Sequence, residues 1–266
     1  MGERKNPHPS SSIECSRQLR AYWITVALLA VCTRAGATTI SLAPAKDNTL
    51  YEDSAGALSN GAGQYLFAGG TNRGDTRRAL LAFDVAAVLP PDAQVTSASL
   101  ILHLSRTVSL SEPISVHRVL SDWGEGTSIA GGQEGAGAPA TPGDATWLHT
   151  FFPSGQWSAT GGDYEANESA ALFAGNEGYY TFSTPELTAD VQAWASGSSS
   201  NFGWMLRGDE GIGRTTKRFD SRENLIAANR PVLSIDYTLA PEPASSFVIS
   251  MIGLGILHRR RARHAR

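Results

Sequence analysis

The spacing of apolar residues constrains the fold of this chain most strongly, because they alternate with polar residues in several short runs. In residues 97–105 every second side chain is apolar, and the same period recurs in residues 79–83, 114–120, 202–206 and 233–237. Side chains of a strand point alternately to its two faces, so this period predicts strands with one buried face. Turn-rich segments such as 89–92 and 208–211 separate the runs. The pattern predicts an all-β protein, a β-sandwich of jelly-roll type.

One interior segment has the signals of a helix. Thr184 suits the N-cap, Pro185 suits the first helical position, and Leu187 and Val191 fall on one face before Gly197. We expect a short helix that closes one end of the sandwich.

A Gly-rich stretch, residues 124–143, contains few apolar residues and predicts a long loop. Loops of this length without regular structure are uncommon in compact domains. The stretch is therefore expected to be either functional or locally disordered.

The end of the chain, residues 241–266, has the character of a sorting tail. Pro241, Glu242 and Pro243 precede an apolar run of 14 residues, which is followed by a cluster of arginines. The run is shorter than the roughly 20 residues of an independent membrane span, and the arginines favour the cytoplasmic face. These features predict a transient membrane contact that leaves the preceding domain exported.

The three ordered elements of this tail resemble the PEP-CTERM sorting signal of Gram-negative bacteria that make extracellular polysaccharide. The resemblance implies recognition and removal of the tail by an exosortase-type processing enzyme. It also implies delivery to the cell surface or its extracellular matrix. The alternative is an ordinary C-terminal membrane anchor, which would place the domain outside the cytoplasm as well.

The first 37 residues have the pattern of a secretory signal peptide. An apolar segment, residues 21–32, follows two arginines, and Ala35 and Ala37 supply the small residues of a cleavage site. We expect cleavage after Ala37, which leaves residues 38–240 as the folded domain. Both cysteines, Cys15 and Cys32, lie in the removed segment. The secreted form is thus expected to have no disulfide and no thiolate chemistry.

The charge of the remaining domain differs from that of the whole chain. Ten of the 22 Lys and Arg residues, but only three of the 25 Asp and Glu residues, lie in the two end segments, so the domain has a net charge near −10. This balance argues against nucleic acid as a partner.

Six short segments then provide a resemblance over most of the domain. They read KDNTL at 46–50, ALLAFD at 79–84, VTSASL at 95–100, WGEG at 123–126, ATW at 145–147 and RFDSRE at 218–223. Their order is similar to that of the DNRLRE domain, which is grouped with carbohydrate-binding module family 96. The resemblance implies a jelly-roll β-sandwich found in secreted proteins, some of which bind acidic polysaccharides such as alginate. The Gly-rich insert at 129–142 departs from the compact pattern of that family.

Five residues are our candidates for contact with a glycan. Sugar rings stack on exposed aromatic rings, and uronate carboxylates bind well to arginine. Trp157, flanked by glycines, and Tyr164 are the aromatic candidates, and we expect Trp157 to be exposed. The basic candidates form one strip, Lys217, Arg218 and Arg222. In contrast, Trp123 and Trp147 are expected to fasten the long loop to the core.

No cofactor is expected, although a weak structural calcium site fits the sequence. Oxygen-rich segments at 47–53 and 72–75 could supply its ligands, and the alternative is that their carboxylates cap turns. His103 and His117 are expected at the surface of strands, and they lack the spacing of a zinc site.

The carboxylate pairs 122/125, 209/210 and 220/223 could in principle hydrolyse glycosides, but nothing in the sequence marks any pair as convergent. We expect the second pair in a solvated turn and the third in a salt-bridge cluster. No Gly-x-Ser-x-Gly nucleophile motif occurs. The sequence therefore predicts no catalytic residues and no enzyme.

Together these features predict an exported, surface-sorted, non-catalytic module that binds or organises extracellular polysaccharide, an acidic one in particular. Two alternatives remain open. One is a structural matrix or spacer protein without a specific ligand, and the other is a polysaccharide-degrading enzyme.

Overall fold

The structure is a computed structural model, and it describes residues 36–239. Most of the predicted signal peptide, including Ala35, lies outside the described residues, as does the sorting motif Pro241–Pro243. Ala37 is exposed and immediately precedes the first strand. In the described part of the chain, no helix is both long and apolar enough to cross a membrane.

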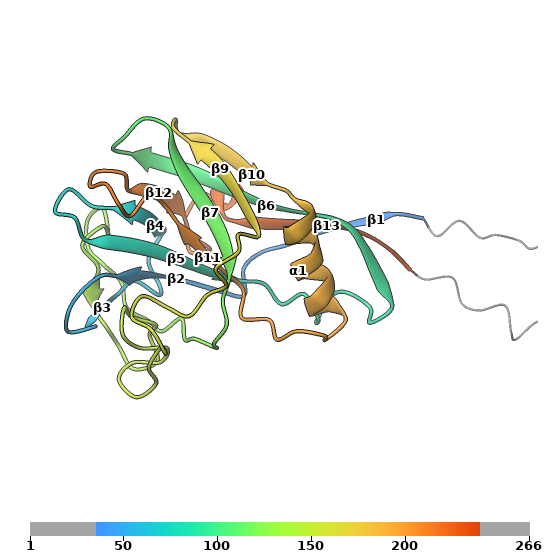
Figure 1. Ribbon diagram of the computed structural model, residues 1–266, viewed down its shortest axis with the longest axis horizontal. Helices are drawn as coiled ribbons and strands as arrows, with labels where there is room; N and C mark the ends of the chain where they lie inside the picture. Colours follow the sequence, from blue (N-terminus) through green and yellow to red (C-terminus); the bar gives the residue numbers. More distant parts are fainter. Residues whose placement is uncertain (1–35, 240–266) are drawn as a thin grey trace, which may run out of the picture. The chain divides into compact units, whose positions relative to one another are not determined.

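The protein is all-β, as the alternation predicts, and its strands form a large curled antiparallel sheet that folds into a β-sandwich of jelly-roll type (Figure 1). Sheet A contains, in order, β1 (Thr38–Leu42), β13 (Val232–Leu239), β6 (Ala93–Thr107), β12 (Lys217–Asp220) and β4 (Tyr65–Gly70), with β10 (Gly178–Phe182) paired to β6. Sheet B continues from β4 through β5 (Thr76–Ala82), β11 (Trp204–Arg207), β7 (Glu112–Arg118) and β9 (Ala170–Ala174), with β2 (Lys46–Tyr51) paired to β5. Because β4 pairs with both β12 and β5, it joins the two sheets.

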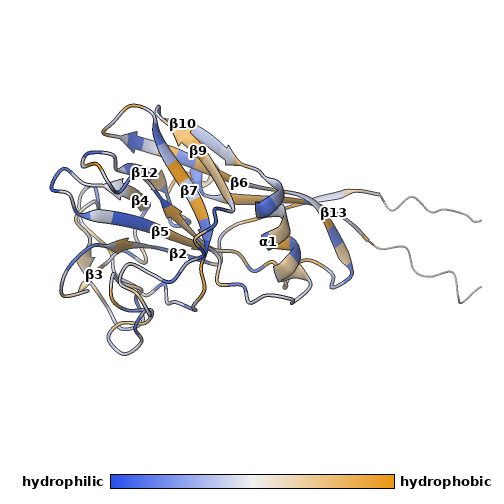
Figure 2. Ribbon diagram, in the orientation of Figure 1, coloured by the Kyte–Doolittle hydropathy of each residue, from blue (hydrophilic) through white to orange (hydrophobic). Residues whose placement is uncertain are grey.

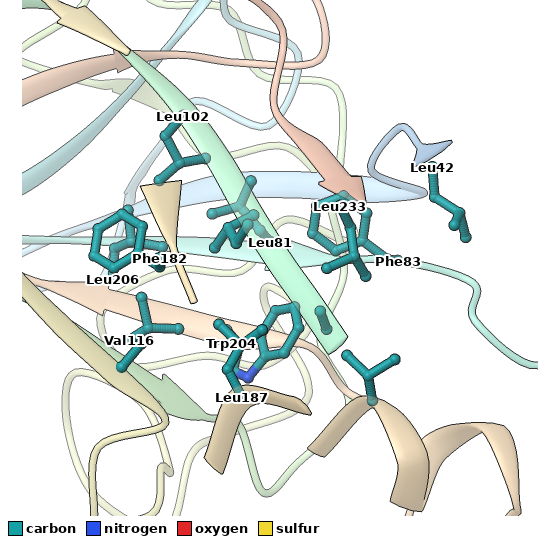
Figure 3. Close-up of a cluster of buried hydrophobic side chains, with 14 of the residues drawn as sticks. Leu42, Leu81, Phe83, Leu102, Val116, Phe182, Leu187, Trp204, Leu206 and Leu233 are labelled. Carbon is teal, nitrogen blue, oxygen red and sulfur yellow. The ribbon is translucent and has the colours of Figure 1, made fainter. Parts of the chain in front are cut away.

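Strand β6 shows how the alternation produces the sandwich. Its even-numbered residues Leu100, Leu102 and Leu104 are fully buried, whereas His103 and Ser105 between them are partly exposed. Leucines from sheet A thus face those of sheet B, and the core lies between the sheets (Figure 3). Each such leucine contributes roughly 1.5–3 kcal/mol through burial.

The predicted helix is confirmed as α1 (Pro185–Ala195). The Thr184 side chain accepts a hydrogen bond from the backbone N–H of Leu187, and Leu187, Val191 and Trp194 are buried. Gly197 has a φ of +69°, a left-handed conformation that suits glycine just after a helix. The apolar face of α1 closes one end of the core, beside β6 and β13 (Figure 1).

The predicted long loop is also observed, but it is packed. The outer face of sheet B carries Leu50, Leu80 and Met205, and the segment between β7 and β9 covers them with Trp123 and Trp157. Only the two-residue strands β3 (Leu58–Ser59) and β8 (Ala138–Pro139) add a small second sheet there. Sheet B is therefore buried on both faces. This double burial explains why successive residues of β5, such as Leu80 and Leu81, are both apolar.

The expectation that Trp157 is exposed is wrong. Its side chain is 6% exposed, and its indole N–H donates to the backbone oxygen of Thr146 at 2.9 Å. The apolar outer face of sheet B must be covered, and the indole of Trp157 provides part of that cover. Trp123 is fully buried in the same cluster, as expected for a residue that fastens the loop.

Candidate functional site

A groove of about 330 Å³ opens where the ends of β4, β6 and β12 meet four loops. These loops lie at the end of the sandwich opposite α1 (Figure 1), and several of them carry the hydrophilic colour of Figure 2. The lining residues are Phe67, Thr71, Asn72, Arg106, Val108, Gln133, Gly135, Arg214, Thr216 and Arg218. We call this feature the arginine groove.

Three arginines give the groove its charge. Arg106 comes from β6, Arg218 from β12, and Arg214 from the loop before β12. Among residues 36–239, none of the three forms an ion pair with a carboxylate. The groove is thus a local positive site on a domain whose overall charge is negative.

Gln133 is the residue that brings two of these arginines together. Its side-chain oxygen accepts hydrogen bonds from Arg106 Nη1 at 3.1 Å and Arg218 Nη1 at 2.5 Å. An amide satisfies donors without cancelling their charge. Both guanidinium groups are therefore held in place and remain available to an anion.

The Arg218 side chain is fixed from two further sides. Its guanidinium carbon lies 3.8 Å from the centroid of the Tyr65 ring, and its Nε donates to Ser105 Oγ at 3.1 Å. Its Nη2 also donates to the Ser105 backbone oxygen at 3.4 Å, so one N–H on each of Nη1 and Nη2 remains for an anion such as a carboxylate.

The Gly-rich insert forms one wall of the groove. Glu134 is buried, and its Oε2 accepts hydrogen bonds from Asn60 Nδ2 at 2.9 Å and from the Tyr65 backbone N–H at 3.0 Å. The hydroxyl of Tyr51 donates to the backbone oxygen of Glu134. These bonds fasten the insert to sheet A and place Gln133 over the arginines.

Backbone strain is concentrated at the same place. In the described part of the chain, the non-glycine residues with a positive φ are Glu134 (63°) and Arg214 (68°). Both border the groove, one beside Gln133 and one as an arginine of the lining. Left-handed conformations are uncommon outside glycine, and such strain often accompanies binding sites.

The structure separates the predicted basic strip. Arg218 lines the groove, but Lys217 points to the opposite face of β12 and is fully buried. Its ammonium donates to Thr107 Oγ1 at 2.7 Å, Ser109 Oγ at 2.8 Å and the Leu110 backbone oxygen at 2.6 Å. Burial lowers the pKa of Lys217. This lysine cannot contact a ligand at the surface, so its expected binding role is wrong.

Tyr164 is half-buried rather than presented as a platform. Its ring packs against His117 at 5.4 Å, and the guanidinium of Arg207 lies 4.7 Å from its centroid. Arg207 and Arg78 both bond to Glu210. Burial raises the pKa of Glu210, but hydrogen bonds from the two arginines outweigh this effect and hold it below its ordinary value. Glu210 is therefore part of an ion-pair network and not of the solvated turn that we expected.

Arg222 lies in a different cluster, which contains Asp47, Glu125 and Glu223 and which we call the carboxylate cluster. One oxygen of each carboxylate lies within 4.8 Å of the others. Arg222 Nη1 contacts both oxygens of Glu125 at 2.7 Å, and its backbone N–H donates to Asp47 Oδ2 at 2.7 Å. Its Nε lies 3.4 Å from Glu223 Oε1.

The electrostatics of the carboxylate cluster follow from its burial. The pKa of Asp47 is raised well above its ordinary value by burial and then by the charge of Glu223. Burial also raises the pKa of Glu223, whereas the hydrogen bond to Glu125 raises that of Arg222. These three carboxylates could hold a cation, although Arg222 already occupies Glu125.

Other acidic residues considered for calcium have local partners. Glu52 accepts a hydrogen bond from the backbone N–H of Thr76, and Asp53 accepts one from that of Ala57. The bond of Asp53 corresponds to the turn-capping alternative, whereas the bond of Glu52 connects it to the first residue of β5.

Neither strand histidine is free at the surface. His117 is 3% exposed, so its expected surface position is wrong; the covering loop and Tyr164 pack over it. His103 is partly exposed, and its Nδ1 lies 2.6 Å from Asp220 Oδ2. Asp220 therefore pairs with a histidine, while the other carboxylate of its predicted pair, Glu223, belongs to the carboxylate cluster.

Sequence reasoning missed Arg106, Arg214 and Gln133. The period of two would place Arg106 on the buried face with Leu102 and Leu104, and a register shift between β6 and β12 brings it opposite Arg218 instead. No local sequence pattern indicates that Gln133 or Arg214 lies near Arg106. Comparison with protein-family models and with curated proteins finds no match to this chain.

Proposed function

We propose that this protein is an exported, surface-sorted, non-catalytic module that binds an acidic extracellular polysaccharide in the arginine groove. The observation that carries the proposal is the meeting of Arg106, Arg214 and Arg218 in one groove, where no carboxylate among residues 36–239 pairs with them. On a domain with a net charge near −10, three arginines in one groove form a local site that attracts an anion.

The chemistry of the groove suits a polyanion. Guanidinium groups bind carboxylates and sulfates through paired charge-assisted hydrogen bonds, which are stronger than neutral ones. Gln133 and Tyr65 hold the guanidinium of Arg218 before a ligand arrives, so less side-chain entropy is lost on binding. Val108, which is 58% exposed, adds apolar surface for the C–H groups of sugar rings.

The export part of the proposal depends on the resemblances at the two ends of the chain. The tail 241–266 is similar to a PEP-CTERM signal, and residues 1–37 to a signal peptide. In this proposal, an exosortase-type enzyme releases the domain to the cell surface or the extracellular matrix of a Gram-negative bacterium. The all-β sandwich agrees with the fold that the DNRLRE resemblance implies.

Affinity electrophoresis of the full chain tests the proposal. Gels containing alginate, a second polyuronate or a neutral glucan would be run with calcium and with EDTA. We expect retardation by the acidic polymers and not by the glucan. The double variant Arg106→Gln/Arg218→Gln should lose most of this retardation, and Arg118→Gln, which removes a partly exposed arginine of sheet B, should not.

Other outcomes would favour the alternatives. Absence of retardation by every polymer would refute the binding function and favour a structural matrix or spacer protein. Shortened polymer after incubation would favour a polysaccharide-degrading enzyme. Equal retardation of the double variant and the wild type would show that the groove is not the binding site.

A further inference from the structure

We propose that the outer face of sheet A carries a second sugar subsite beside the arginine groove, where a sugar ring stacks on Tyr179 and a hydroxyl group bonds to His103. This inference rests on the proposed function, and it extends the binding surface beyond the groove.

The two residues face each other across neighbouring strands. Tyr179 of β10 lies opposite His103 of β6 in the register of the sheet, and their ring centroids are 4.7 Å apart. Tyr179 is 57% exposed. One part of its ring therefore contacts the imidazole, and the rest is open to solvent as a flat apolar surface.

Both rings are held in fixed orientations. The Tyr179 hydroxyl donates to the backbone oxygen of Ala228 and to Asn229 Oδ1, at 3.2 and 3.0 Å. His103 Nδ1 lies 2.6 Å from the carboxylate of Asp220, which is itself 1% exposed. An exposed aromatic ring that is anchored by its polar end is pre-organised for stacking and needs little further ordering.

The hydrogen bond to Asp220 also determines which nitrogen remains available. Because Nδ1 of His103 is engaged, Nε2 is the nitrogen that can bond to a ligand. A neutral imidazole would accept a hydrogen bond from a sugar hydroxyl there. The site thus combines an apolar ring with one oriented polar group, the combination that a sugar residue requires.

The subsite is continuous with the arginine groove. Ser105 lies two residues beyond His103 on the same face of β6, and its Oγ accepts a hydrogen bond from Arg218 Nε. On the next strands, Asp220 pairs in register with Tyr65, whose ring carries the Arg218 guanidinium. Along β6, His103 and Arg106 are separated by about 10 Å at the usual rise of a strand. A polysaccharide chain in the groove can therefore extend over Tyr179.

The two sites should select different properties of the ligand. The arginines recognise negative charge, whereas stacking on Tyr179 depends on the C–H face that every pyranose ring presents. Short acidic oligosaccharides should fill only the groove. Longer ones should gain affinity from the subsite as well.

Titration of the full chain with alginate oligosaccharides, graded in length from the disaccharide upward, tests this inference. Tyr179→Ala should weaken binding of the longer oligosaccharides by about three- to tenfold and leave the disaccharide unaffected. Tyr179→Phe retains the ring and should bind within about twofold of the wild type. Phe173→Ala is the matched control, since Phe173 is 69% exposed on β9 of the other sheet.

A second measurement does not depend on a variant. In the NMR spectrum of the wild type, the ring signals of His103 should shift with longer oligosaccharides and not with the disaccharide. The inference is overturned if Tyr179→Ala binds all lengths as the wild type does, or if the His103 signals never move. It is also overturned if a folded Tyr179→Ala loses affinity equally at every length. If the wild type binds no acidic oligosaccharide, the proposed function itself is refuted. This result is distinguishable from failure of the subsite alone, in which the wild type still binds.

Discussion

The arginine groove and the carboxylate cluster each gather three like charges from distant parts of the chain, but within residues 36–239 only the cluster contains a compensating charge. In the cluster, Arg222 bonds to Glu125 and Asp47, and the raised pKa values of Asp47 and Glu223 favour retention of a proton. In the groove, the neutral amide of Gln133 is the acceptor for two arginines.

Both sites depend on the same Gly-rich loop, residues 124–143, which supplies Glu125 to the carboxylate cluster and Gln133 to the groove. Where the loop provides a carboxylate, the opposing arginine forms an ion pair within the fold. Where it provides an amide, the arginines keep their charge. The two regions therefore differ in local compensation of charge, and on this difference we treat one as a structural cluster and the other as a candidate binding site.

The largest effect is expected from loss of the compensating charge in the cluster. Arg222→Gln should lower the free energy of unfolding by about 2–3 kcal/mol, because it removes the cation that pairs with Glu125 and Glu223, an effect reduced by the partial exposure of Arg222. Urea denaturation measures this change. The matched variant Arg218→Gln removes an arginine that pairs with no carboxylate of the described residues, and it should lower the free energy of unfolding by less than about 1 kcal/mol. Equal losses in the two variants would contradict the comparison.

Gln133→Glu should convert the groove into a compensated site. The new carboxylate would pair with Arg106 and Arg218, and we expect affinity for alginate to fall about tenfold, which corresponds to about 1.4 kcal/mol. Affinity electrophoresis or calorimetry measures the loss. Gln94→Glu makes the same change at an exposed position of β6 and serves as the control. If Gln133→Glu binds alginate with unchanged affinity, the arginine groove is not the binding site.

The smallest effect is expected in the pH dependence of stability. Asp47 and Glu223 have pKa values above their ordinary ones, so the folded state binds more protons than the unfolded state above about pH 4. The stability that these two groups contribute is fully present at lower pH and is lost as the pH rises through their folded pKa values. The free energy of unfolding of the wild type should therefore decline with rising pH, and Asp47→Asn should reduce this decline.

Urea unfolding midpoints of the wild type and of Asp47→Asn across this pH range measure the difference. Asp236→Asn is a suitable control, because the pKa of Asp236 is lowered by its hydrogen bonds and its contribution changes in the opposite direction. If the stability of the wild type and that of Asp47→Asn decline equally with rising pH, our account of the carboxylate cluster is contradicted.

Part of the candidate site was within reach of the sequence. Residues 217 and 218 occupy successive positions of a strand, so the period of two already places Lys217 and Arg218 on opposite faces. Grouping them with Arg222 as one strip overlooked this. The burial of Trp157 was harder to predict from the sequence, because it depends on the apolar outer face of sheet B and on which loop covers that face.

The sequence by itself determined the strands, the helix after Thr184 and the long loop, because these depend on the spacing of residues that are near one another in the chain. The tertiary structure alone decided which charges meet. Arg106, Gln133 and Arg218 come from separate parts of the chain, and only the antiparallel pairing of β6 with β12 and the attachment of Glu134 place them around one groove. Whether an arginine is neutralised or remains free depends on its neighbours in space, which local patterns do not specify.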